Sequence, residues 1–171
     1  MKKFSIILGT ILFQINLYAQ WKAEVKLDEF KQPTGEFQAF TKSEVRHNNQ
    51  LIFTIITVFD LPEDSTKIQE PYTFYLFRPK YQDDFITREN SYLSILDEKN
   101  QKHRINLKLE DRDARVKIED TEKLTELLKI NTKIKCIVIE EEQMQFMFTI
   151  NCIGFTKAYN TVKTTTNKKT N

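Results

Sequence analysis

Alternation of apolar and polar residues is the feature that most constrains this chain. In "WKAEVKL" every second residue from Trp21 to Leu27 is apolar, and the residues between them are charged. A repeat of two places the apolar side chains on one face, which is typical of a half-buried β-strand. A chain with many such segments is predicted to fold mainly as β-sheet.

The same reasoning predicts strands along most of the sequence. "LIFTIITVF" (51–59) is a continuous β-branched and aromatic run, as in a strand that is covered on both faces. "KIKCIVIEE" and "EQMQFMFTINC" are predicted to form a hairpin that turns at Glu140–Gln143. The other predicted strands span residues 35–47, 72–77, 92–97, 104–110 and 114–119.

Two short segments depart from the period of two. In "EDTEKLTELLKIN" the residues Leu124, Leu127 and Leu128 form an apolar stripe, which predicts a short helix near 121–130 that packs on the sheet. "IGFTKAYN" (153–160) is predicted to form a short C-terminal helical turn.

These elements predict a single all-β domain over residues 20–160. No Pro/Gly/Ser-rich linker divides it, and the expected architecture is a mainly antiparallel β-sandwich with the two short helices. A lipocalin-like barrel is the alternative. The final "TVKTTTNKKTN" (161–171) has no apolar periodicity and is expected to be a disordered basic tail.

The first 19 residues have the pattern of an export signal. Lys2 and Lys3 precede an apolar run, and Ala19 is the small residue at the expected cleavage position. The run is shorter than the about 20 apolar residues of a membrane-spanning helix. We therefore expect residues 1–19 to be a signal peptide, with no transmembrane segment after its removal and a mature protein in the periplasm or outside the cell.

The charge balance argues against nucleic acid as a partner. The chain has 26 basic and 24 acidic residues, so loss of Lys2 and Lys3 leaves equal numbers. A formally neutral domain lacks the positive charge that binding to phosphates requires.

The two cysteines invite a disulfide in an exported chain, but their register argues against one. In the predicted hairpin Cys136 faces Phe146 or Phe148, and Cys152 lies several residues further along. A disulfide requires Cα atoms within about 7 Å. Both thiols are therefore expected to be free and to point into the core.

Catalytic, cofactor and metal motifs are not found. His47 and His103 stand in polar segments without metal-site spacing and are expected to be exposed. The sequence has no nucleophile elbow, glycine-rich phosphate loop or C-x-x-C motif. We assign no catalytic residue, no metal ligand and no cofactor. Neighbouring carboxylates that glycoside hydrolysis might recruit occur at Asp28/Glu29, Asp83/Asp84 and Glu140–Glu142, and are interpreted as solvated charge.

Aromatic and cationic residues alternate within "PYTFYLFRPKYQDDF" (71–85). Rings and cations can bind a ligand by stacking and by cation–π contact. The candidate binding surface comprises Tyr72, Tyr75, Phe77, Arg78 and Tyr81, and burial on both sides of the strand is the alternative.

The segment "LDEFKQPTGEF" (27–37) combines three carboxylates with a proline and a glycine. We expect Pro33, Thr34 and Gly35 to form the turn between two strands. Phe30 and Phe37 would anchor its two arms, and the carboxylates would face water.

Both ends of the chain resemble a group of uncharacterised exported proteins of Gram-negative bacteria. "WKAEVKLDEFKQPTGEF" is similar to their early tryptophan strand and Asp-Glu-Phe-Gly-x-Pro-Thr-Gly turn, and "FMFTINCIGFTKAYN" to their Gly-Phe-x-x-Ala-Tyr ending. Lys31 stands where the group has glycine. The group has no activity or catalytic residues to transfer, and a remoter likeness to accessory proteins of type VI secretion or invasion implies a β-sandwich.

The sequence thus favours an exported, non-enzymatic binding or accessory protein. Its partner would be a protein or small molecule of the cell envelope, and the oligomeric state stays open. The alternatives are a lipocalin-like carrier of a small ligand and a hydrolase that uses surface carboxylates.

Overall fold

The computed structural model of the chain describes residues 20–27, 30–47, 50–61, 70–77, 91–110, 113–140 and 143–169. The predicted signal peptide, residues 1–19, lies outside these ranges. No helix in the described ranges is long and apolar enough to cross a membrane.

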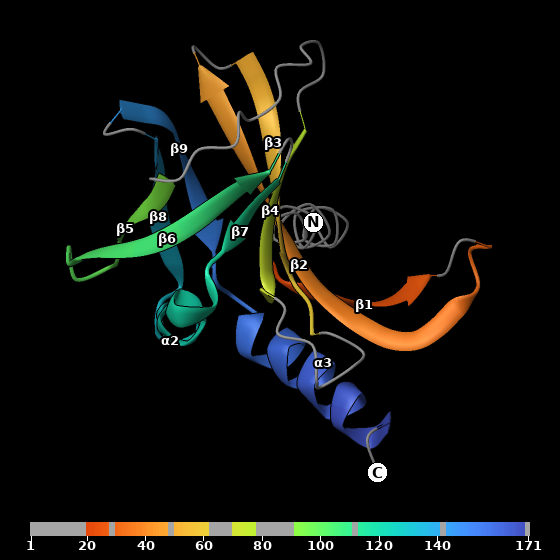
Figure 1. Ribbon diagram of the computed structural model, residues 1–171. Coiled ribbons are helices and arrows are strands. Elements are labelled where there is room, and N and C mark those ends of the chain that lie inside the picture. Colours follow the sequence, from red (N-terminus) through yellow and green to blue (C-terminus); the bar gives the residue numbers. More distant parts are fainter. Residues whose placement is uncertain are drawn as a thin grey trace, which may run out of the picture.

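The described strands form one antiparallel sheet, which confirms the predicted all-β class (Figure 1). All of the described strands are hydrogen-bonded into this one sheet. The predicted division into two stacked sheets is therefore not confirmed. In spatial order the strands are β1 (Lys22–Leu27), β2 (Pro33–His47), β3 (Gln50–Phe59), β4 (Tyr72–Phe77), β7 (Asp113–Val116), β6 (Lys102–Glu110), β5 (Ser91–Leu96), β8 (Lys133–Glu140) and β9 (Gln143–Asn151).

The sheet curls until its last strand, β9, lies beside β2. The Ser43 hydroxyl on β2 donates a hydrogen bond of 2.7 Å to the carbonyl oxygen of Thr149 on β9. At the base of the sheet the Trp21 amide donates to the carbonyl oxygen of Ile153, at 3.1 Å. Long-range contacts therefore bring the two ends of the sheet order together.

The predicted helix is confirmed as α2 (Thr121–Ile130), preceded by a short 3-10 turn, η1 (Ile118–Asp120). Leu124, Leu127 and Leu128 are buried, as expected of a stripe that packs on the sheet. The Asn131 side-chain amide donates to the Leu127 carbonyl at 2.9 Å and so satisfies one of the last carbonyls of the helix.

The expectation of a disordered tail from residue 161 is wrong. Helix α3 (Phe155–Lys169) continues through this segment, and Val162 is fully buried. Phe155, Ala158 and Val162 recur at helical spacing and bury one face. The threonine-rich sequence concealed this helix, because threonine has a modest helix propensity. Here the Thr161 hydroxyl donates to the Lys157 carbonyl at 3.0 Å, within the helix.

Aromatic side chains join the base of the sheet to α3. The ring centroids of Trp21 and Phe155 lie 4.8 Å apart, and those of Phe59 and Tyr72 lie 4.9 Å apart. Tyr159 stacks against Phe59 with centroids at 4.8 Å. Such ring pairs add about 0.5–1.5 kcal/mol each beyond the burial of their surface. The cluster fixes α3 against strands β3 and β4.

The first hairpin differs from its prediction. Pro33–Gly35 belongs to β2, and the chain turns before it, where Lys31 adopts a left-handed φ of 61°. Val25 pairs with Phe37 and Leu27 with Pro33, so β2 carries extra residues and forms a bulge opposite Lys26. Gly35 lies in the bulge with a φ of 80°, a conformation that favours glycine.

Two further expectations for this hairpin are wrong. Phe30 is not a buried anchor of the hairpin, because 74% of its surface is exposed, whereas Phe37 packs against the core. Glu36 does not face water, because only 8% of its surface is exposed. Asp28 and Glu29 lie outside the described residues.

The last hairpin has the predicted register. Cys136 lies opposite Phe148, and both Cys136 and Cys152 are buried free thiols. Burial raises the pKa of the Cys152 thiol to about 12. Burial likewise raises the pKa of Cys136, so neither thiol is ionised near neutral pH.

Candidate ligand groove between β2 and β9

An open groove of about 750 Å³ separates the second half of β2 from the ends of β8 and β9. This volume falls within the range of about 300–1,000 Å³ typical of small-molecule sites. The groove is lined by Lys42, Ser43, Glu44, Thr54, Thr132, Lys133, Thr149, Asn151 and Ile153.

The groove exists because β2 is longer than its partner β1. Strand β1 pairs with β2 only as far as Phe40, which faces Lys22. From Thr41 onward this edge of β2 has no strand ladder within the described part of the chain, and β9 approaches it there. The two strands make contact at Ser43 and Thr149 without becoming a regular pair, and space remains beside that contact.

Main-chain polar groups of β9 point into this space. The Cys152 amide donates to the Thr132 carbonyl at 2.7 Å, so even-numbered residues at this end of β9 face β8. In a strand successive residues direct their N–H and C=O groups to opposite sides. Thr149 and Asn151 therefore direct theirs toward the groove, as the bond from Ser43 to the Thr149 carbonyl shows.

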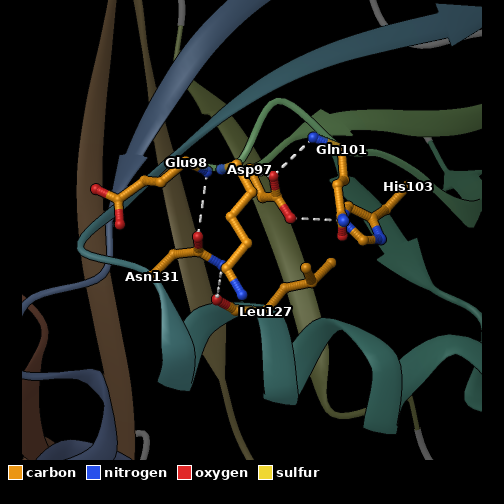
Figure 2. Close-up of polar contacts among 7 residues, drawn as sticks. Asp97, Glu98, Gln101, His103, Leu127 and Asn131 are labelled. Atoms are coloured by element: carbon orange, nitrogen blue, oxygen red, sulfur yellow. Dashed lines mark hydrogen bonds and ion pairs between the residues drawn. The ribbon is translucent and has the colours of Figure 1, made fainter.

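A polar junction around Glu98 and Asn131 fixes the end of the groove at Thr132, and Figure 2 shows the bond between Glu98 and Asn131. The Glu98 amide donates to the Asn131 side-chain oxygen at 3.2 Å, and the Thr132 amide donates to the Glu98 carboxylate at 3.1 Å. The Thr132 hydroxyl also bonds that carboxylate. These bonds, led by the one from the hydroxyl, lower the pKa of Glu98. The junction thereby holds the backbone at Thr132 against the tip of the β5–β6 hairpin.

Asp97 shapes the turn from which Glu98 projects (Figure 2). One carboxylate oxygen accepts the amides of Lys99 at 2.9 Å and Gln101 at 2.8 Å. The other lies 3.0 Å from Nε2 of His103. His103 is therefore a half-buried residue of β6 whose ring contacts the Asp97 carboxylate, not the exposed loop residue that the sequence predicted. The contact with His103 is the largest cause that lowers the pKa of Asp97.

The groove lining favours recognition by hydrogen bonds. Its hydroxyl and amide groups can both donate and accept, and its charged groups have both signs. Glu44 is its only carboxylate among the described lining residues, whereas glycoside hydrolysis usually uses two carboxylates. The chemistry suits a polar ligand with several hydroxyl or amide groups.

The predicted aromatic surface is not assembled as expected. Tyr72 is fully buried, and its hydroxyl shares a 2.7 Å hydrogen bond with the Thr125 hydroxyl. Tyr75 lies on the opposite face of β4 and is 40% exposed. The prediction is wrong for Tyr72 because that face of β4 meets the core. Arg78 and Tyr81, and the side chain of Phe77, lie outside the described part.

Two carboxylates do converge, around Lys26. The Lys26 amine lies 2.7 Å from Asp60 and 3.4 Å from Glu36. Partial burial is the main cause that raises the pKa of Asp60. Burial lowers the pKa of Lys26, but contacts with Asp60 and Glu36 outweigh it and raise the pKa overall. The amine neutralises much of the charge of both carboxylates, so we interpret the cluster as a clamp joining β1, β2 and the end of β3.

The other carboxylate candidates lie only partly within the described residues. Asp83, Asp84, Glu141 and Glu142 lie outside the described residues, and Glu140 is buried at the end of β8. Across the described ranges, no group of three or more His, Cys, Asp or Glu side chains has an arrangement that could hold a metal ion.

A small apolar void lies inside the described part of the sheet. Its volume is about 10 Å³, which is near the space that one water molecule needs. Side chains from β3 to β9 line it, among them Ile55, Phe74 and Phe148.

Sequence reasoning missed the groove. The one signal available was the presence of serine or threonine on the inward-facing side of β2, where alternation predicts apolar residues. Ser43 and Thr41 occupy such positions and are buried.

Comparison with known proteins adds no relative: no family model, no curated protein and no solved structure matches the chain.

Proposed function

We propose that this chain is an exported, non-enzymatic binding protein whose ligand occupies the groove between β2 and β9. The groove volume of about 750 Å³, together with its hydroxyl and amide lining, is the observation that carries the proposal. The signal-like residues 1–19 support export to the periplasm or beyond.

The arrangement of the groove suits binding without large rearrangement. The junction at Glu98 and Asn131 holds one end, and the bond between Ser43 and Thr149 holds the other. Polar groups held in place before binding lose less conformational freedom when a ligand arrives. A preformed groove of this kind favours modest, hydrogen-bond-dependent affinity for a polar molecule.

The two alternative functions have weaker support. A carrier with its ligand inside the sheet would need far more than the void of about 10 Å³. A hydrolase would draw on Glu36 and Asp60, which are already engaged with Lys26.

A thermal-shift screen of neutral saccharides, short peptides and lipids tests the proposal. Ile153 lines the groove and its side chain is exposed, so Ile153→Arg should fill the site without disturbing the core. Ile130→Arg is the matched control, because Ile130 is also exposed but lies at the end of α2. Stabilisation by a polar compound should vanish in Ile153→Arg and persist in Ile130→Arg. Equal stabilisation of both variants would place the ligand elsewhere.

A further inference from the structure

Strand β1 is the last strand at one edge of the sheet that the described residues form. It pairs with β2 on one side, and the described residues contain no strand on the other. The open edge begins after Trp21, whose amide is bonded to Ile153. The Lys26 carbonyl faces β2, where it accepts a hydrogen bond of 3.1 Å from the Thr34 hydroxyl. Ala23 and Val25 therefore direct their main-chain groups to the side opposite β2, because backbone direction alternates along a strand. An edge with free N–H and C=O groups can pair with another strand.

Apolar side chains gather on this exposed strand and its turn. Val25 is 36% exposed, Leu27 is 58% exposed, and Phe30 in the adjoining turn is 74% exposed. Strand β1 and the first half of β2 project from the rest of the sheet as an arm (Figure 1). Apolar groups that gather on an exposed, projecting element often mark an interface.

The sequence of β1 complements itself when it runs antiparallel to a second copy. With Val25 opposite Val25 of the second copy, Glu24 lies opposite Lys26 and Ala23 lies opposite Leu27. Opposite residues in an antiparallel pair share one face. The apolar side chains therefore meet on one face of the joint sheet, and opposite charges meet on the other.

Neighbouring registers are less favourable. Centring the pair on Glu24 places Glu24 opposite Glu24 and Lys22 opposite Lys26, which juxtaposes like charges. Centring it on Ala23 requires a strand beside Trp21, where Ile153 already occupies the edge. The extra residues of the bulge belong to β2, so β1 itself stays regular enough to pair.

We propose that the chain forms a symmetric dimer in which β1 pairs antiparallel with β1 of a second copy about an axis at Val25. The Lys26 amine is already shared by Glu36 and Asp60 of its own chain, so its charge contributes to the choice of register more than to affinity. A ladder of one short strand implies a reversible dimer.

Sedimentation velocity over a concentration series tests the dimer. Leu27→Arg places a charge on the apolar face and should weaken association at least tenfold. Ile130→Arg, at an exposed position on α2, should associate like the unaltered chain. Circular dichroism melts of both variants check that they remain folded. A monomer at every concentration, or equal association of the two variants, would overturn the proposal.

Cysteine cross-linking tests the register. Paired residues that exchange backbone hydrogen bonds have Cα atoms about 5.5 Å apart, within the range of a disulfide. Val25→Cys should therefore give a covalent dimer under diamide, whereas Glu24→Cys, opposite Lys26, should not. The native thiols of Cys136 and Cys152 are buried and do not compete. Cross-linking of Glu24→Cys as fast as of Val25→Cys would exclude the proposed register.

Discussion

The Ser43 hydroxyl donates a 2.7 Å hydrogen bond to the main-chain oxygen of Thr149, across 106 positions of sequence. This contact joins the two sides of the groove where β9 approaches β2 without a regular ladder. The stability of this part of the sheet therefore depends on a side chain more than on backbone pairing.

Ser43→Ala should weaken the contact between β2 and β9. Loss of a buried hydrogen bond costs about 1 kcal/mol of unfolding free energy. Hydrogen exchange at the amides of Phe148 and Ile150, which face β8, should accelerate more than the global loss predicts. Ser94→Ala is the control, because Ser94 lies on β5, between β6 and β8. If the two variants change the hydrogen-exchange rates of β9 equally, Ser43 does not hold β9 against β2.

Two glycines should differ in their tolerance of alanine. Gly35 and Gly154 both have a left-handed φ, of 80° and 84°, which costs other residues about 1–2 kcal/mol. A Cβ at Gly35 would meet nothing within 4 Å, whereas one at Gly154 would lie 3.2 Å from the Trp21 carbonyl oxygen. In urea unfolding, Gly154→Ala should therefore lower the unfolding free energy more than Gly35→Ala does. The reverse order would contradict the close approach of the Trp21 main chain to Gly154.

Lys31→Gly should stabilise the chain. Lys31 adopts a φ of 61°, a region that glycine enters without the steric cost borne by lysine. Glycine also raises the entropy of the unfolded chain, so the net gain should be about 0.5–1 kcal/mol in urea unfolding. Asn100, also at 61°, is the control, because asparagine tolerates this region and Asn100→Gly should gain less. Destabilisation by Lys31→Gly would show that the turn differs from the one described.

The Asp97 carboxylate should make the free energy of unfolding fall at acidic pH. Its pKa is lowered in the folded chain by His103 and by the amides of Gln101 and Lys99. A lowered pKa contributes stability above the ordinary aspartate pKa of about 4, and that stability is lost as pH falls through the folded value. In urea unfolding from pH 7 to pH 2, Asp97→Asn should lose less stability below pH 4 than the unaltered chain. If the unfolding free energies of the two proteins changed with pH in parallel, the pKa of Asp97 would be the same in the folded and unfolded chain.

The sequence was sufficient where local pattern decides structure. The leucine stripe located α2, and strand alternation placed Cys136 opposite Phe148. The turn before β2 was misplaced because the bulge at Gly35 uses the same residues that commonly make turns. Lys31 occupies a left-handed position that glycine takes more readily than lysine.

Features that depend on residues distant in the sequence could not be predicted from the sequence pattern. Alternation assigns a residue to a face but does not say which strand will cover it, so Tyr72 was expected in a binding surface. The burial of Glu36 depends on Lys26, which lies on β1, and on Asp60, which follows β3. The groove itself arises from the meeting of Ser43 and Thr149, and local periodicity contains no information about that pairing.

Two-dimensional ¹H–¹⁵N NMR with the polar compound that most stabilises the chain tests the binding proposal most directly. We expect saturable shifts of the amides around the groove, at Ser43, Thr149, Asn151 and Ile153, and their loss in Ile153→Arg. Shifts confined to another surface would contradict the assignment of this groove as the ligand site, as would a screen that yields no bound polar compound.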